Sequence, residues 1–139
     1  MVFQISLFAT SIIDLDRLKK KDGKHTILFF HMNYCPYCER FISVSLNNPN
    51  IKEQIKKDFN YIDININEDG DIKFDSFKGD KYHFSQYFDI NFYPTILFLD
   101  NNNEIVYTMR GYRDQKTFKN ILRYIKTKSY NDLDFVDYK

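Results

Sequence analysis

Hydrophobic and polar positions along this chain follow two periods, one typical of strands and the other of helices. Four segments predict strands: 26–32, 61–66, 95–99 and 104–110. The first is a continuous apolar run, as expected for a strand covered on both faces. The second alternates strictly, which places Ile62, Ile64 and Ile66 on one face. The Asn-rich segment 100–103 predicts a turn that joins the last two strands into a hairpin.

Start and stop signals predict the helices between these strands. The predicted helices are 12–21, the segment from Pro36 to the Asn47-Asn48-Pro49 break, 50–59, 82–88 and a last helix that begins at Asp114. Ser11 is the expected cap of the first helix, and Asn50 with Glu53 resembles a capping box for the third. The polar, Gly-containing segment 67–81 is predicted to be a loop or a small insertion. This order implies an α/β domain with a mixed sheet and helices on both faces.

The composition limits the class of protein. A length of 139 residues without a repeat or linker predicts one domain over 1–139. The 14 Phe and 11 Tyr residues can fill a substantial core, which a disordered chain would lack. A net charge of +1 argues against a dedicated nucleic-acid module, which carries a clear basic excess. Two cysteines exclude a disulfide-dense scaffold and a four-cysteine zinc site within one chain.

The N-terminal residues do not predict a targeting segment. The uncharged stretch 1–13 contains no basic n-region and leads into no clear small-residue cleavage site, so it is not typical of a signal peptide. No apolar stretch is long enough to span a bilayer as a helix. The compartment stays open on this evidence.

The two cysteines lie three residues apart, after a buried strand and at the start of a helix. This Cys35-Pro36-Tyr37-Cys38 sequence has the spacing and position of a redox motif. Free helix N–H groups and the helix dipole stabilise a thiolate at the first cysteine. We therefore interpret Cys35 as the nucleophile and Cys38, one turn later, as the resolving thiol.

At this point the chain resembles the thioredoxin-fold oxidoreductases. Three separated features carry the resemblance: the CPYC sequence, Tyr93-Pro94-Thr95 before a strand, and Gly111-Tyr112 before the last helix. The chain is most similar to the bacterial periplasmic thioredoxin-like proteins of the SoxW type. The resemblance covers about 12–126 and leaves 127–139 as a C-terminal extension, which we expect to dock on the domain.

The resemblance implies a substrate-binding surface around the cysteines. It identifies Pro94 as the cis-proline of the family and places the backbone of Tyr93 beside a substrate strand. The residues implied for substrate binding are Tyr34, Pro36, Tyr37, Tyr93, Pro94 and Thr95.

One position departs from thioredoxin itself, and two nearby side chains are further candidates for the site. The buried acid of thioredoxin, six residues before the first cysteine, corresponds to Phe29, so that position supplies no carboxylate to the resolving thiol. Glu39 is the nearest acid in sequence and a candidate for proton transfer. His31, four residues before Cys35, is a candidate for contact with a thiolate or for a third metal ligand.

These features predict a thiol–disulfide oxidoreductase that acts on protein disulfides, favoured as a reductant, with an upstream electron donor. The exchange requires no metal and no organic cofactor, only the Cys35–Cys38 disulfide. We expect a monomer without nucleic-acid partners. The resemblance implies a periplasmic protein whose signal peptide has been removed, with the cytoplasm as the alternative.

Three other functions remain open at the level of sequence. A glutaredoxin-like, glutathione-dependent reductase would share the Pro36-Tyr37 dipeptide, but this chain lacks the Gly-Gly-Asp element that glutaredoxins usually show after the hairpin. A copper or zinc carrier would use Cys35, Cys38 and His31. A non-catalytic binding module would keep its cysteines oxidised.

Overall fold

The central element of the fold is a four-stranded mixed sheet. The computed structural model describes residues 12–18 and 22–138. Four strands form this sheet in the order β3-β2-β6-β7: β2 (His25–His31), β3 (Phe59–Asn65), β6 (Thr95–Leu99) and β7 (Ile105–Arg110). Strands β2 and β3 are parallel, whereas β6 is antiparallel to both β2 and β7. The four predicted strands and the mixed sheet are confirmed.

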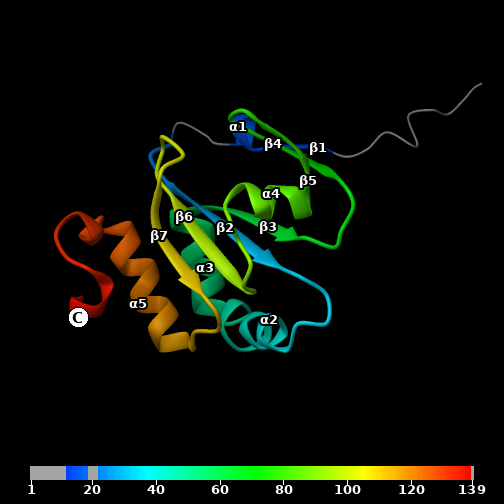
Figure 1. The fold of residues 1–139 in the computed structure, drawn as a ribbon. Coiled ribbons are helices and arrows are strands. Elements are labelled where there is room, and N and C mark those ends of the chain that lie inside the picture. Colours follow the sequence, from blue (N-terminus) through cyan, green and yellow to red (C-terminus); the bar gives the residue numbers. More distant parts are fainter. Residues whose placement is uncertain (1–11, 19–21, 139) are drawn as a thin grey trace, which may run out of the picture.

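Alternate residues of β2 face two different hydrophobic clusters. Ile27 and Phe29 pack with the helices on one face of the sheet, and Leu28 and Phe30 pack on the other. The first face is covered by α2 (Pro36–Arg40), its π-helical continuation η2 (Phe41–Leu46), α3 (Pro49–Asp58) and α5 (Gln115–Lys126). Helix α4 (Lys81–Tyr87) covers the second face (Figure 1). The prediction of helices on both faces is confirmed.

A second, three-stranded sheet occupies a region that the sequence analysis assigned differently. It has the order β1-β4-β5 and consists of β1 (Ile12–Asp14), β4 (Asp71–Phe74) and β5 (Phe77–Asp80). The sequence predicts a loop or a small insertion over 67–81; the loop form of this prediction is wrong, because 71–80 form a hairpin. Its apolar residues Ile72, Phe74 and Phe77 pack in the cluster that includes Phe84 of α4. Tertiary packing stabilises these short strands. The polar composition of the segment does not predict them.

Two predicted helices have different N-termini in the structure. The first begins later than expected, and the third begins one residue earlier. Residues 12–14 are a strand paired with β4, and only α1 (Leu15–Leu18) is helical, while Ser11 and Lys19–Lys21 lie outside the described residues. Helix α3 is capped by Asn48 and not by Asn50. The Asn48 side chain accepts hydrogen bonds from the N–H groups of Asn50 and Ile51.

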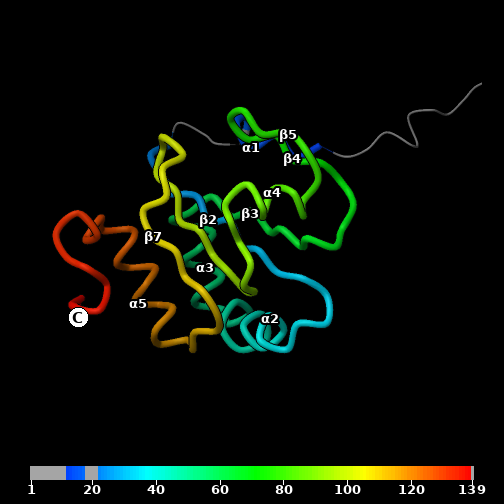
Figure 2. The backbone as a smooth tube through the Cα atoms, viewed as in Figure 1, coloured from blue at the N-terminus to red at the C-terminus, as the bar shows by residue number. Residues whose placement is uncertain are grey.

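The C-terminal extension folds back beside α5, as the red end of the tube in Figure 2 shows. Phe135 and Tyr138 pack against Tyr124 of α5, and the Tyr124 hydroxyl donates to the Leu133 carbonyl over 2.7 Å. Residues 127–138 therefore dock on the domain as expected.

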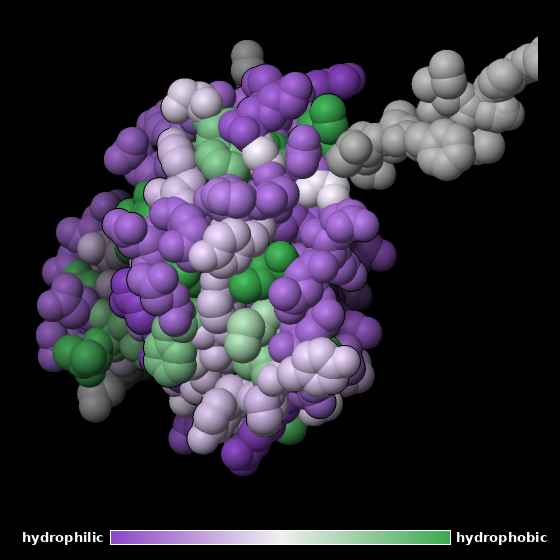
Figure 3. Space-filling view, turned by 45° about the vertical axis from the view of Figure 1, so that its right-hand side comes forward, coloured by the Kyte–Doolittle hydropathy of each residue, from purple (hydrophilic) through white to green (hydrophobic). Residues whose placement is uncertain are grey.

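Apolar side chains reach the surface in Figure 3 as small patches between hydrophilic residues. Among the described residues, no helix has the length and hydrophobicity needed to cross a membrane.

Candidate active site

Cys35 and Cys38 lie at the N-terminus of α2 and are joined by a disulfide with a Cα–Cα distance of 5.2 Å. Cys35 is the N-cap residue, and Pro36 occupies the first turn, where its missing N–H costs nothing. The backbone N–H of Cys38 donates to the Cys35 sulfur over 3.2 Å. The same hydrogen bond would stabilise negative charge on that sulfur in the reduced protein.

Exposed aromatic side chains surround cysteines that are themselves buried. Cys38 is 1% exposed and Cys35 is 5% exposed, whereas Tyr34 is 95% exposed and Tyr37 is 60% exposed. Tyr34 has a φ of 55°, a left-handed conformation unusual for a bulky residue, immediately before Cys35. The site therefore presents rings to a partner, while most of the surface of both cysteines is covered.

The loop before β6 lies against Cys35, although the two segments are 58 residues apart. The Cys35 sulfur is 3.8 Å from the carbonyl oxygen of Tyr93, and the Tyr93–Pro94 peptide bond is cis. Gly111, with a φ of 86°, donates its N–H to the Pro94 carbonyl over 2.8 Å, which ties this loop to the end of β7. Tertiary structure thus brings together the three separated features of the sequence.

Tyr93 faces the site with its backbone and the core with its ring. Its hydroxyl bonds to Ser85 Oγ over 3.1 Å, and the ring packs against the cluster on the α4 face. Thr95 is buried, and its hydroxyl donates to the Phe92 carbonyl. Phe92 itself is 53% exposed and was missed by the sequence analysis. The one feature of the sequence that could have indicated Phe92 is its position as an aromatic residue two positions before Pro94.

Glu39, the proton-transfer candidate, and the β2 residues Phe29 and His31 occupy different environments. Glu39 is exposed on α2, and its backbone N–H bonds to the Cys35 carbonyl. Phe29 is fully buried. His31 stacks on Phe29 with a ring-centroid distance of 4.6 Å, and its Nε2 lies 2.9 Å from a carboxylate oxygen of Asp63. The Asp63 partner was not anticipated, because it lies 32 residues away in sequence.

The proposed set of metal ligands does not gather in the structure. Across residues 12–18 and 22–138, no group of three or more His, Cys, Asp or Glu side chains could hold a metal ion. His31 is paired with Asp63, so this part of the chain offers the two cysteines no third ligand.

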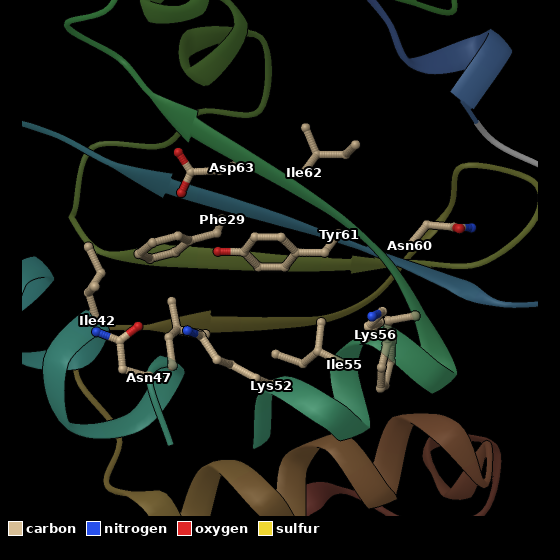
Figure 4. A pocket seen from close by; sticks show the side chains of 12 residues that line it. Phe29, Ile42, Asn47, Lys52, Ile55, Lys56, Asn60, Tyr61, Ile62 and Asp63 are labelled. Atoms are coloured by element: carbon tan, nitrogen blue, oxygen red, sulfur yellow. The ribbon is translucent and has the colours of Figure 1, made fainter. Parts of the chain in front are cut away.

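A groove of about 670 Å³ lies on the helical face beside β3, and neither cysteine lines it. Phe29 forms part of its wall, and Tyr61 and Asp63 of β3 lie beside it (Figure 4). Burial and the nearby Asp63 carboxylate raise the pKa of Tyr61, so its phenol stays protonated at physiological pH.

A CxxC disulfide at a helix N-terminus, packed against a cis-proline loop on a mixed sheet, defines a protein of the thioredoxin type. The family model described as thioredoxin-like domain matches residues 14–126, and the chain belongs to this family. Family and site together make it a thiol–disulfide oxidoreductase.

Solved structures show the same fold. A thioredoxin-fold protein from Helicobacter pylori is 26% identical, with a TM-score of 0.71, over 81% of this chain and 75% of that chain. A thioredoxin from Thermus thermophilus is 18% identical, with a TM-score of 0.67, over 87% and 90% of the two chains. The reduced C-terminal domain of DsbD from Neisseria meningitidis is 16% identical, with a TM-score of 0.57, over 78% and 86%. Curated protein sequences gave no match.

Proposed function

We propose that this protein reduces disulfides in protein substrates by exchange at Cys35 and Cys38. The arrangement around Cys35 carries the proposal. Its sulfur accepts the Cys38 N–H, faces the Tyr93 carbonyl and lies among exposed aromatic rings. In the reduced protein, the Cys35 thiolate attacks a substrate disulfide and forms a mixed disulfide. Cys38 then attacks the Cys35 sulfur and releases the second substrate thiol.

The loop and the aromatic residues give the substrate chain its position. Tyr34, Pro36 and Tyr37 offer exposed surface beside Cys35. The Tyr93 backbone is the proposed pairing site for an extended substrate segment, and the buried Pro94 and Thr95 hold it in place. The two sulfurs carry both electrons, so the reaction needs no further cofactor. We propose that a monomer acts with an upstream electron donor in the periplasm, which follows the resemblance to SoxW-type proteins.

The first test is insulin reduction with dithiothreitol as electron donor. The native protein is expected to accelerate insulin precipitation, and the Cys35→Ser variant is expected to abolish this activity. Wild-type activity in Cys35→Ser would overturn the proposal. A requirement for glutathione as donor would instead favour a glutaredoxin-like reaction.

The direction of electron flow is tested by the reduction potential of the Cys35–Cys38 pair in a thiol redox buffer. A potential near or below about −270 mV, where thioredoxin lies, would support the reductant role. A potential between roughly −120 and −200 mV would contradict it, because the pair would then act as an oxidant or isomerase.

A further inference from the structure

A histidine–aspartate pair lies at the end of β2 that leads into the CxxC. The Nε2 atom of His31 is 2.9 and 3.0 Å from the two carboxylate oxygens of Asp63. The His31 side chain is 12% exposed, while that of Asp63 is 50% exposed. Since an ionised carboxylate only accepts hydrogen bonds, Nε2 carries the proton in the neutral ring. The Nδ1 atom is then left as a hydrogen-bond acceptor.

The pair lies on the same face and at the same end of the sheet as Cys38. Phe29 contacts Phe41 of η2, with a ring-centroid distance of 5.7 Å. Because α2 and η2 connect two parallel strands, they run opposite to β2. The step from Phe41 back to Cys38 is about 4.5 Å along the helix, and the step from Phe29 to His31 is about 6.6 Å along the strand, toward the same end. We infer that His31 lies on the face and at the end of the sheet where the first turn of α2 begins.

The resolving thiol needs a group that takes its proton. Cys38 is 1% exposed, and burial in apolar surroundings disfavours a thiolate. Phe29, fully buried, offers no carboxylate from its position on β2. We propose that His31, oriented by Asp63, accepts the proton of the Cys38 thiol during resolution; this inference rests on the proposed function. The transfer occurs directly to Nδ1 or through one water.

The step balances as follows. The S–H bond of Cys38 breaks, its proton passes to His31, and the sulfur lone pair attacks the Cys35 sulfur. A Cys35–Cys38 bond forms, and the bond from Cys35 to the substrate sulfur breaks. The substrate thiolate leaves with the bonding pair, and the imidazolium returns its proton to solvent. Two electrons have then moved from the protein to the substrate.

Other charged groups lie on the elements around His31. Asp63 on β3 contacts it directly, and Lys52 and Lys56 of α3 line the groove that Asp63 also borders. Glu39 and Arg40 on α2 are exposed, and the Arg40 guanidinium lies 4.6 Å from the centre of the Tyr112 ring. Among these groups, only Asp63 forms a hydrogen bond with the imidazole in the described part of the chain.

The reaction of the reduced protein with 5,5′-dithiobis(2-nitrobenzoate) separates the two chemical steps. The first nitrothiobenzoate release reports attack by Cys35, and the second reports resolution by Cys38. In His31→Gln, the second release is expected to slow about 10²-fold, the lower end of typical general-base contributions, with the first unchanged. Asp63→Asn is expected to slow the second release less. His83→Gln is the matched control, because His83 forms an exposed pair with Asp80 on α4, across the sheet.

Two further readouts separate proton transfer from a structural role. In His31→Gln, resolution must proceed through the free Cys38 thiolate, so the rate of the second release is expected to rise more steeply with pH than in wild type. Added imidazole is expected to restore the second release in His31→Gly. If His31→Gln does not fold, the dependence of the second-release rate on pH is measured in Asp63→Asn instead. A dependence equal to that of wild type overturns the proposal.

An unchanged second release in His31→Gln also overturns the proposal. The proposal is also overturned if the second release slows in Glu39→Gln but does not slow in His31→Gln, because Glu39 would then take the proton. These results leave insulin reduction by wild type intact. Failure of the proposed function would instead appear as wild-type protein without insulin reduction.

Discussion

The backbone N–H of Cys38 donates a hydrogen bond to the sulfur of Cys35 over 3.2 Å. This contact follows from the position of Cys35 as N-cap of α2, where a side-chain acceptor satisfies a free N–H of the first turn. The two sulfurs therefore have distinct environments. The sulfur of Cys35 receives a hydrogen bond and lies beside the Pro94 loop, whereas Cys38 is the more deeply buried of the two, at 1% exposed against 5%.

This difference predicts opposite results for the two single-cysteine variants. Cys38→Ser keeps the attacking thiolate but cannot resolve the mixed disulfide, so it is expected to accumulate a covalent complex with a protein substrate. Cys35→Ser is expected to form none. Non-reducing electrophoresis and mass spectrometry of each variant with insulin measure the complex. Equal capture by Cys35→Ser would reverse the assignment of nucleophile and resolving thiol.

The exposed rings of Tyr34 and Phe92 predict a specific loss of activity toward protein substrates. Removal of either ring, as in Tyr34→Ser or Phe92→Ser, is expected to lower kcat/KM for insulin by about tenfold, as for an interface residue worth more than 1 kcal/mol. Reaction with a small aromatic disulfide is expected to change little. Tyr82→Ser is the control, because Tyr82 is similarly exposed on α4. An equal loss in the control would contradict the docking role.

His25 predicts how stability changes between neutral and mildly acidic pH. Its Nε2 lies 2.7 Å from the Tyr130 hydroxyl, and burial, with the positive charge of Lys128, lowers the pKa of His25 below 6.5. As the pH falls below about 6.5, the unfolded chain takes up a proton before the folded one. The free energy of unfolding should therefore decrease from pH 7.5 to 5.

Urea denaturation at both pH values tests this. His25→Gln is expected to reduce the pH slope, and an unchanged slope would refute the assignment. Tyr130→Phe is expected to cost about 0.5–1.5 kcal/mol at pH 7.5, the typical net contribution of one hydrogen bond.

Asp114 predicts a separate loss of stability in stronger acid. Asp114 is the N-cap of α5, and its carboxylate accepts hydrogen bonds from the backbone N–H and the side chain of Thr117. These bonds hold the pKa of Asp114 below 3.8. Its contribution is present above pH 3.8 and lost as the pH falls through the lower folded pKa. Asp114→Ala is expected to cost about 1 kcal/mol at pH 7, and Asp114→Asn, which keeps a cap, less. Asp114→Asn should also show a smaller loss between pH 4 and 2.5; an identical loss in wild type and variant would exclude this cap.

Local signals were sufficient for much of the fold. The apolar run that became β2 is buried on both faces, and the helical spacing after Asp114 became α5 with Phe118 and Ile121 in the core. The CxxC needed only its spacing and its position before a helix. Local signals were insufficient where packing decides. The strands β4 and β5 are four residues each, and they are held by Phe84 from a later helix.

The type of chemistry and the order of the main elements can be predicted from the amino-acid sequence, because both depend on residues close together in the chain. The sequence placed two thiols one helical turn apart, and it specified strands and helices by their periods. Tertiary structure decided which distant residues meet: Tyr93 with Cys35, Asp63 with His31, and Tyr130 with His25. These contacts depend on sheet register and helix packing, which act over separations of 32 to 105 residues and leave no local pattern.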